Sequence, residues 1–431
     1  MTRTRQHTSP RTRVAAVLVA GAIALTACGG DVTPPDQSAH PDTPVFEGTV
    51  GVDWVRGGSD FLFDYLNQYD IAVGAGALWM LSDGNGVDID GAVGPSNPVE
   101  PVLLTSLDGE NWTEFDYQAL GIPTSFDYRP FLISGTDRIT VVFRAPTGGD
   151  DAPYVLVGDA SADGVTWSVT TPDDFAPWAL TDRRGMIHKP LFIGGGAWVG
   201  DALMLIVKAQ FRMPGAAGQV PTTDESFSFM RLGPNGAERI ADSGEPLGGE
   251  RLLRTGSSIG VQVVAHNGAL HFFAGTADSG ALHFTHWSTT DLGETWTSTT
   301  VPTATATGAP YVTLHDSAVL DGRVVLVGSN ADESLIVTSD DFENWHFVTL
   351  PETDRLTHVA ATKNGFWAFN NVSDPGGLWH SVDGVEWEAI STDEALRSLN
   401  DVVGTPDGLI AIIARVVSLS GITPPHLLLE E

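Results

Sequence analysis

The chain has little cysteine, little lysine and few basic residues of any kind. Cys28 is its only cysteine among 431 residues, so no disulfide joins two parts of the chain. Lysine and arginine together number 22 against 54 acidic residues, and the formal net charge is −32. A surface of that sign repels nucleic acid and anionic lipid headgroups, so we expect neither as a partner. A domain of this size builds a sufficient hydrophobic core without disulfides, and we expect a monomer.

The sequence also lacks two common motifs of metal-assisted and phosphate chemistry. It contains no His-Glu-x-x-His pair and no phosphate-binding loop. His283 and His286 lie three residues apart in a β-rich segment. We expect both to belong to one strand and to have a structural role.

No apolar run is long enough to cross a bilayer. The run over residues 14–25 follows four arginines and is shorter than the roughly 20 apolar residues of a spanning helix. It fits the apolar part of a secretory signal, which has about 7–15 residues. The segment Leu25-Thr26-Ala27-Cys28-Gly29 resembles the lipobox of bacterial lipoproteins. This resemblance implies that Cys28 is diacylated, and two acyl chains hold a protein firmly on a membrane. The alternative is an ordinary signal peptide.

Three regions follow from this reading. We expect a signal peptide over residues 1–27 and a tether over residues 28–44, because this stretch is rich in Pro, Asp, Ser and Thr. The folded domain is expected over residues 45–431. The predicted location is the extracellular face of the bacterial cell membrane.

One short pattern, a Ser followed by Asp-Gly or a variant and then a Trp, recurs along the folded region. Its copies span residues 106–112, 161–167, 288–296, 339–345 and 381–387, with a degenerate copy at 233–239. Neighbouring copies lie about 40–70 residues apart, close to the repeat length of propeller blades. Asp-Gly supplies the positive φ of a tight hairpin, and the Asp carboxylate and Ser hydroxyl accept bonds from the backbone amides of the turn. The Trp covers the loop with an apolar face.

These copies resemble the Asp-box (BNR) repeat of sialidase-like β-propellers, Ser-x-Asp-x-Gly-x-Thr-Trp. The copy from Ser288 to Trp296 is nearest to the pattern, with Asp291, Gly293 and Thr295 in place. Short β-rich runs after Gly-bearing turns separate the copies. The resemblance implies an all-β propeller of four-stranded blades. We expect seven blades, with six as the alternative, and a ring closed by pairing of the N-terminal and C-terminal strands.

The same resemblance raises the question of sialidase chemistry. That chemistry uses a Tyr nucleophile late in the chain, whereas the last tyrosine here is Tyr311. The fragments beginning at Phe143 and Phe211 resemble the family's Phe/Tyr-Arg-Ile-Pro motif but follow the first and second repeats instead of preceding the first. We therefore lean towards a protein that is not an enzyme.

An acidic segment after the first β-rich run resembles a calcium loop, with oxygen ligands at alternate positions. Its candidate ligands are Asp83, Asn85, Asp88 and Asp90. Val87 interrupts the pattern and no Glu closes it, so an acidic hairpin without metal is the alternative. No other cofactor is expected.

A ligand site is expected in the central funnel, at the start of the innermost strands. Aligning the repeats by their Gly turns brings five residues to comparable positions there: Arg129, Lys189, Asp316, His358 and Asp401. The Arg129 and Lys189 segments align especially well, which would set two basic groups together and favour an anionic or polar glycan. Charges around a solvated channel are the alternative.

The sequence thus predicts a cell-surface lipoprotein whose propeller binds or scaffolds a polysaccharide or protein partner without catalysis. A sialidase-like glycoside hydrolase acting on extracellular glycans is the competing class. A third class is an assembly factor for a membrane complex, because Asp-box propellers resembling photosystem assembly factors exist.

Overall fold

The computed structural model describes most of the strands of the chain. The described residues are 45–47, 53–57, 68–83, 100–107, 111–126, 129–144, 153–162, 164–175, 180–181, 187–188, 192–213, 222–233, 236–242, 261–278, 281–302, 313–329, 334–350, 356–369, 378–390, 399–404, 410–418 and 421–430.

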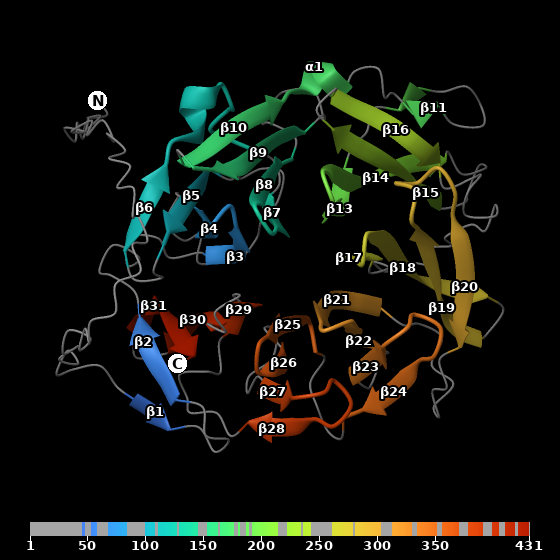
Figure 1. Cartoon of the computed structure of the whole chain (residues 1–431). Coiled ribbons are helices and arrows are strands. Elements are labelled where there is room, and N and C mark those ends of the chain that lie inside the picture. The colour runs from blue at the N-terminus through green and yellow to red at the C-terminus, as the bar shows by residue number, and fades with distance from the viewer. Residues whose placement is uncertain are drawn as a thin grey trace, which may run out of the picture.

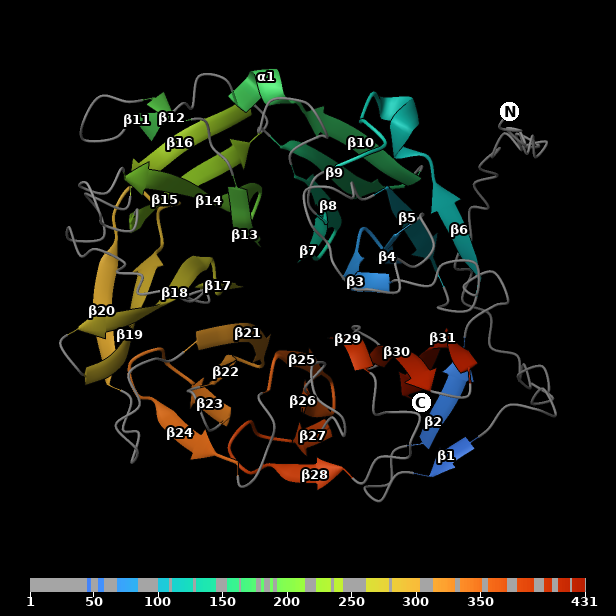
Figure 2. The same ribbon diagram turned by 180° about the vertical axis from the view of Figure 1, so that it is seen from behind.

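Antiparallel sheets stand in a ring around a central axis, as Figures 1 and 2 show from opposite sides. Six of these sheets have four strands each, and within each the strands lie side by side in chain order. Their strands are β3(Gln68–Gly74), β4(Ala77–Asp83), β5(Pro101–Ser106) and β6(Trp112–Phe115); β7(Phe131–Gly135), β8(Arg138–Phe143), β9(Tyr154–Ser161) and β10(Gly164–Thr170); β13(Phe192–Val199), β14(Ala202–Met213), β15(Thr222–Gly233) and β16(Gly236–Asp242); β17(Val261–His266), β18(Ala269–Asp278), β19(Ala281–Thr289) and β20(Thr297–Pro302); β21(Thr313–Leu320), β22(Arg323–Ser329), β23(Ser334–Ser339) and β24(His346–Thr349); β25(His358–Thr362), β26(Gly365–Phe369), β27(Leu378–Ser381) and β28(Glu388–Ile390).

A five-stranded sheet closes the ring with strands from both ends of the described chain. Its order is β1(Val45–Glu47), β2(Asp53–Gly57), β31(Gly421–Glu430), β30(Ile410–Ser418) and β29(Leu399–Gly404). Trp54 of β2 pairs with Glu430 of β31. The predicted propeller, closed by its N-terminal and C-terminal strands, is confirmed. Its six four-stranded blades agree with the alternative number, and the closing sheet is a further sheet in the same ring.

The other described elements are short. They are the strands β11(Leu180–Thr181) and β12(Ile187–His188), the 3-10 turn η2(Tyr117–Leu120) and the helix α1(Pro172–Phe175). Among the residues that the structure describes, no helix is long and apolar enough to cross a membrane.

The hydrophobic core lies between neighbouring blades. One buried cluster joins Trp79 and Leu103 of the β3–β6 sheet to Ile139 and Phe143 of the β7–β10 sheet. Further clusters join each of the next four-stranded sheets to the following one. Each sheet therefore buries both of its faces, which explains why its strands contain nearly continuous apolar runs, as in Val324–Val327.

The tryptophans of the repeat loops pack on the preceding blade. The Trp167 ring lies 5.3 Å from that of Trp79, and the Trp296 ring lies 4.6 Å from that of Phe229. The Trp345 ring lies 5.7 Å from that of Phe273. Each of these tryptophans therefore both covers its own loop and attaches its sheet to the previous one.

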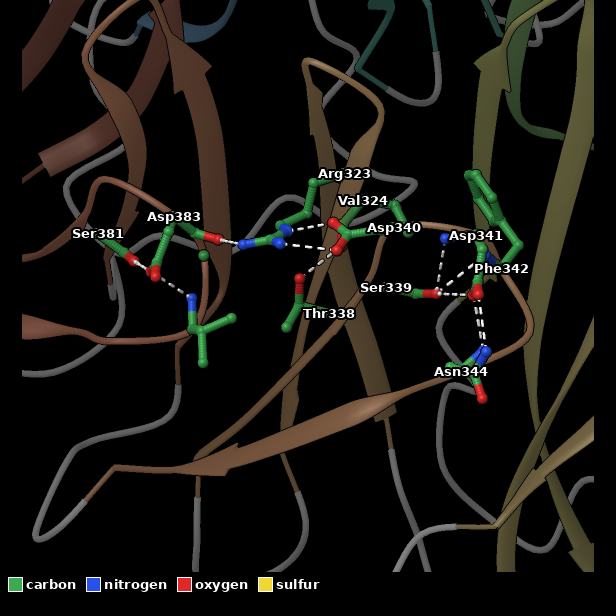
Figure 3. Close-up of polar contacts among 12 residues, drawn as sticks. Arg323, Val324, Thr338, Ser339, Asp340, Asp341, Phe342, Asn344, Ser381 and Asp383 are labelled. Carbon is green, nitrogen blue, oxygen red and sulfur yellow. Dashed lines mark hydrogen bonds and ion pairs between the residues drawn. The ribbon is translucent and has the colours of Figure 1, made fainter.

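Two of the repeat loops close through hydrogen bonds that the sequence predicted. In the loop over residues 339–345, the Ser339 hydroxyl accepts from the Phe342 amide at 2.9 Å, and the Asp341 carboxylate accepts from the Asn344 amide at 2.7 Å. Figure 3 shows this arrangement. Asp383 accepts in the same way from the amides of Val385 and Glu386.

One detail of the predicted pattern is wrong. In the copy over residues 288–296, the hydroxyl that anchors the turn belongs to Thr289, which accepts from the Gly293 amide at 2.8 Å. Ser288 instead lies 2.8 Å from the Thr297 hydroxyl on the paired strand. The reason is strand alternation, because successive side chains point to opposite faces and only Thr289 points towards the loop.

Candidate functional site

The innermost strands each carry one residue at an equivalent position around the axis of the ring. Backbone irregularities interrupt β3, β13, β21 and β29, and the residues that follow them are Asp70, Gly195, Asp316 and Asp401. Phe131, Gln262 and His358 hold the matching positions, four residues before the ends of β7, β17 and β25. We name these seven residues the channel ring.

Three members of the channel ring form a hydrogen bond with the innermost strand of the following blade. Asp70 accepts from the Leu132 amide at 2.6 Å. Asp316 accepts from the Val359 amide at 2.9 Å. Gln262 donates to the His315 carbonyl at 2.7 Å. Each bond crosses from one blade to the following one, so the ring residues also hold the blades together.

The Asp70 and Asp316 carboxyls have unusual protonation behaviour. Burial among protein atoms raises the pKa of each to about 7, although backbone amides at both sites act in the opposite direction. The Arg144 guanidinium lowers the pKa of Asp70, whereas the Asp316 charge raises it. The Asp316 side chain nevertheless keeps 34% of its surface exposed. Carboxyls with a raised pKa that keep some contact with solvent are frequent at functional sites.

The channel ring has two unlike arcs. The acidic arc consists of Asp70, Asp316 and Asp401 together with His358. The His358 Nδ1 lies 3.8 Å from Asp316 Oδ2, and its ring is stacked 4.8 Å from that of Phe369. Phe131, Gly195 and Gln262 form the other arc and carry no charge themselves, but the Arg144 guanidinium lies 4.6 Å from the Phe131 ring centre. Phe131 also packs against the core cluster that contains Ile133 and Val142, and the titratable groups of the ring gather on the arc of Asp316 and His358.

The structure places the five predicted funnel residues unequally. It brings Asp316 and His358 together and sets the Asp401 backbone at the same level on β29. Arg129 is exposed just before β7, and Lys189 lies outside the described residues, so the predicted pairing of the two basic groups stays a prediction.

Asp70, Gln262 and Arg144 are site residues that the sequence interpretation missed. A signal for Asp70 was present, because it precedes the Ala75-Gly76 turn by the same spacing that separates Asp316 from the Asp321-Gly322 turn.

The predicted calcium loop lies almost wholly outside the described residues. Asp83 is the last residue of β4, whereas Asn85, Asp88 and Asp90 are not described. Within the described ranges, no group of three or more His, Cys, Asp and Glu side chains is placed to hold a metal ion. Calcium binding by this loop stays a prediction.

Comparison with known proteins bears on the fold alone. No family model matches the chain, and no curated protein matches it. Among solved structures, an acylaminoacyl peptidase in complex with a chloromethyl ketone matches 87% of the chain and 53% of its own length, with a TM-score of 0.52 and 10% identity. The Pyrococcus horikoshii acylaminoacyl peptidase matches 86% and 52%, with a TM-score of 0.50 and 10% identity. The chain thus spans about half the length of these two propeller proteins.

A third match is the NanB sialidase of Streptococcus pneumoniae. It covers 87% of the chain and 70% of its own length, with a TM-score of 0.40 and 11% identity. At 10% identity the chain shares a β-propeller fold with the two acylaminoacyl peptidases, and fold does not imply function.

Proposed function

We propose that the chain is a non-catalytic binding propeller, displayed on the extracellular face of the bacterial cell membrane, whose channel ring takes a polar glycan. The observation that carries the proposal is the pair of partly exposed polar side chains Asp316 and His358, which lie 3.8 Å apart on neighbouring innermost strands. Sugars offer several hydroxyls to such polar groups.

Backbone donors fix the orientation of the Asp316 carboxyl. Its Oδ1 accepts from the Ser317 amide at 2.7 Å while its Oδ2 accepts from the Val359 amide. Each oxygen keeps a second acceptor site, so the carboxyl can also bond a ligand hydroxyl from a fixed position.

The sequence supports display at the membrane and, separately, membership of the Asp-box propellers. The lipobox-like segment ending in Cys28 and Gly29 supports a lipid tether. The repeat loops support membership of the Asp-box propellers, because their hydroxyl and carboxylate bonds have the expected donors. Replacement of Cys28 by Ser should abolish incorporation of radiolabelled palmitate and release the protein from the membrane fraction. Retention of label by this variant would contradict the tether.

The full chain, purified in detergent, tests the ligand proposal against a glycan panel and a set of fluorogenic glycosides. We expect binding without turnover, weakened at least about tenfold by His358→Ala. His346→Ala is the matched control, because His346 is exposed on the outer strand β24 and should leave binding unchanged. Turnover of a glycoside would contradict the non-catalytic role. Capture of a protein partner with no glycan bound would contradict the ligand class.

A further inference from the structure

A buried histidine pair joins the β17–β20 sheet to the following blade. His271 of β18 and His286 of β19 are 8% and 5% exposed, and the His271 Nδ1 lies 3.0 Å from the His286 Nε2. One of these two nitrogens must donate the shared hydrogen and the other must accept it. Two protonated imidazoles have donors only, so the bond exists only while at least one ring is neutral.

The pair packs on a side chain from the next blade. Phe342 of the 339–345 repeat loop is 7% exposed, and its ring lies 3.6 Å from that of His271 at an angle of 14°. The His286 ring lies 5.5 Å from that of Phe342 and 6.0 Å from that of Trp345. The loop therefore rests on the histidine pair through two aromatic side chains.

Phe342 occupies this position in an uncommon backbone conformation. Its φ is +59°, in the left-handed region that favours glycine, and the Ser339 hydroxyl holds its amide. The loop over residues 289–296 shows what the same conformation does without histidines. There Leu292 has a φ of +56° and packs against the apolar cluster of Phe229 and Trp287.

We propose that this seam between the β17–β20 and β21–β24 sheets is an acid-sensitive joint, in which charging of the His271–His286 pair releases the repeat loop that carries Phe342. The device goes beyond the proposed ligand binding, because it requires no ligand. The bond from Gln262 to the His315 carbonyl joins the same two sheets, so release would loosen one of the links between them.

The groups that could alter the charging of the pair come from each element around it. His266 of β17 has its ring 5.8 Å from that of Phe342, and β20 contributes the Thr299 hydroxyl, 3.4 Å from the His286 Nδ1. The facing blade carries Asp321 and Arg323 at its inner turn and Asp340, Asp341 and Glu343 in the loop. Asp340 is bonded by Arg323 and Asp341 by the loop amides, so both carboxylates already have partners.

Burial lowers the pKa of His271 to about 3 and of His286 to about 4 in the closed joint, and the charges of His286 and His266 add to the effect at His271. A hydrogen bond to the Phe342 backbone acts in the opposite direction at His286. A histidine exposed by opening gains its proton near pH 6.5. Below about pH 6.5 the open form thus binds protons that the closed form does not bind, and opening becomes easier as pH falls.

Hydrogen exchange of the full chain, followed by mass spectrometry of peptides, tests the joint. After correction for the intrinsic exchange rate, we expect opening of residues 339–345 to rise at least about tenfold between about pH 6.5 and about pH 5. The 289–296 loop is the internal control and should show no such rise. Equal pH dependence of the two loops would overturn the proposal.

Two variants separate charging from packing. His271→Asn with His286→Gln keeps hydrogen-bonding groups without titration, and the pH dependence of the 339–345 loop should disappear. Phe342→Leu copies the side chain that the sister loop tolerates, so it keeps the fold while removing the contact with the histidines. We expect its loop to open more at pH 7 and to respond less to acid. An unchanged acid response in Phe342→Leu would overturn the proposal even if the double variant failed to fold.

Discussion

Asp70 and Asp316 occupy the same position in two blades that are not neighbours, and each carboxylate accepts a backbone N–H from the next innermost strand, at 2.6 Å from Leu132 and 2.9 Å from Val359. Each of these side chains therefore links its blade to the following one. The oxygen of a neutral amide side chain could accept the same backbone N–H.

Replacement of Asp70 or Asp316 by Asn should stabilise the protein above pH 7. The folded pKa of about 7 exceeds the unfolded value of 3.8, so each carboxyl stabilises the fold in acid and loses this contribution as pH rises from about 4 through 7. In each Asn variant the free energy of unfolding should fall less steeply as pH rises, and at pH 8 it should exceed the wild-type value by about 1 kcal/mol. This figure is discounted because solvent screens the exposed part of the side chain. Urea unfolding at a series of pH values measures it. Asp321→Asn, at an exposed turn, is the control, and an unchanged slope at both channel sites would contradict the prediction.

Gly74 and Gly404 should not tolerate a side chain. A Cβ at Gly74 would collide with the Arg138 carbonyl, and one at Gly404 with the Ala361 carbonyl, each on a neighbouring sheet. Because backbone blocks the space, alanine at either site should lower the free energy of unfolding by about 1–3 kcal/mol. Gly195→Ala is the control, since a Cβ added there would have no other atom within 4 Å, and should stay within about 0.5 kcal/mol of the wild type. Similar losses at all three sites in thermal unfolding would refute this reading of the packing.

The ion pair between Arg323 and Asp340 should stabilise the β21–β24 blade. The Arg323 guanidinium bonds both oxygens of Asp340, at 2.7 Å for the Nη2–Oδ2 contact, and reaches the Asp383 carbonyl of the following repeat loop (Figure 3). A double-mutant cycle of Arg323→Gln and Asp340→Asn should give a coupling of about 0.5–1.5 kcal/mol, since both side chains keep contact with solvent. The coupling should shrink in high salt, and a zero value at low salt would contradict it. Arg138 bridges Asp159 and Asp201 in the same manner and should behave alike.

Trp296 should contribute more through packing than through its indole hydrogen bond. Its ring lies 4.6 Å from that of Phe229, and its Nε1 donates to the Gly293 carbonyl at 3.1 Å. Trp296→Ala should cost about 2–4 kcal/mol, and Trp296→Phe only about 1 kcal/mol, because phenylalanine keeps an aromatic face against the preceding blade. Denaturant unfolding compares the two variants with Glu294→Ala, an exposed control in the same loop. Equal losses for Phe and Ala would show that the hydrogen bond dominates.

The repeats predicted the architecture because each copy is a local device. The Ser339 and Asp341 bonds of one loop join residues at most three apart, so residue types alone predict them. The Thr289 anchor was assigned to Ser288 because the pattern does not show which of two adjacent hydroxyls points into the loop.

The seven-residue channel ring was harder to predict from the pattern. The sequence interpretation singled out Asp316 and His358 because a turn follows each at a countable distance, whereas it overlooked Asp70. The irregularity between Gln68 and Asp70 shifts the side chain towards the channel, and such shifts depend on how the sheet twists.

By itself, the sequence determined the loops, the β-strands and the closure of the ring, because short-range hydrogen bonding and repeated hydrophobic segments carry that information. Only the tertiary structure decided which distant side chains share an environment. The Asp316 charge raises the pKa of Asp70, and His271 and His286 meet the ring of Phe342 from another blade. Their pKa values follow from burial among residues far away in the chain, which no local pattern contains.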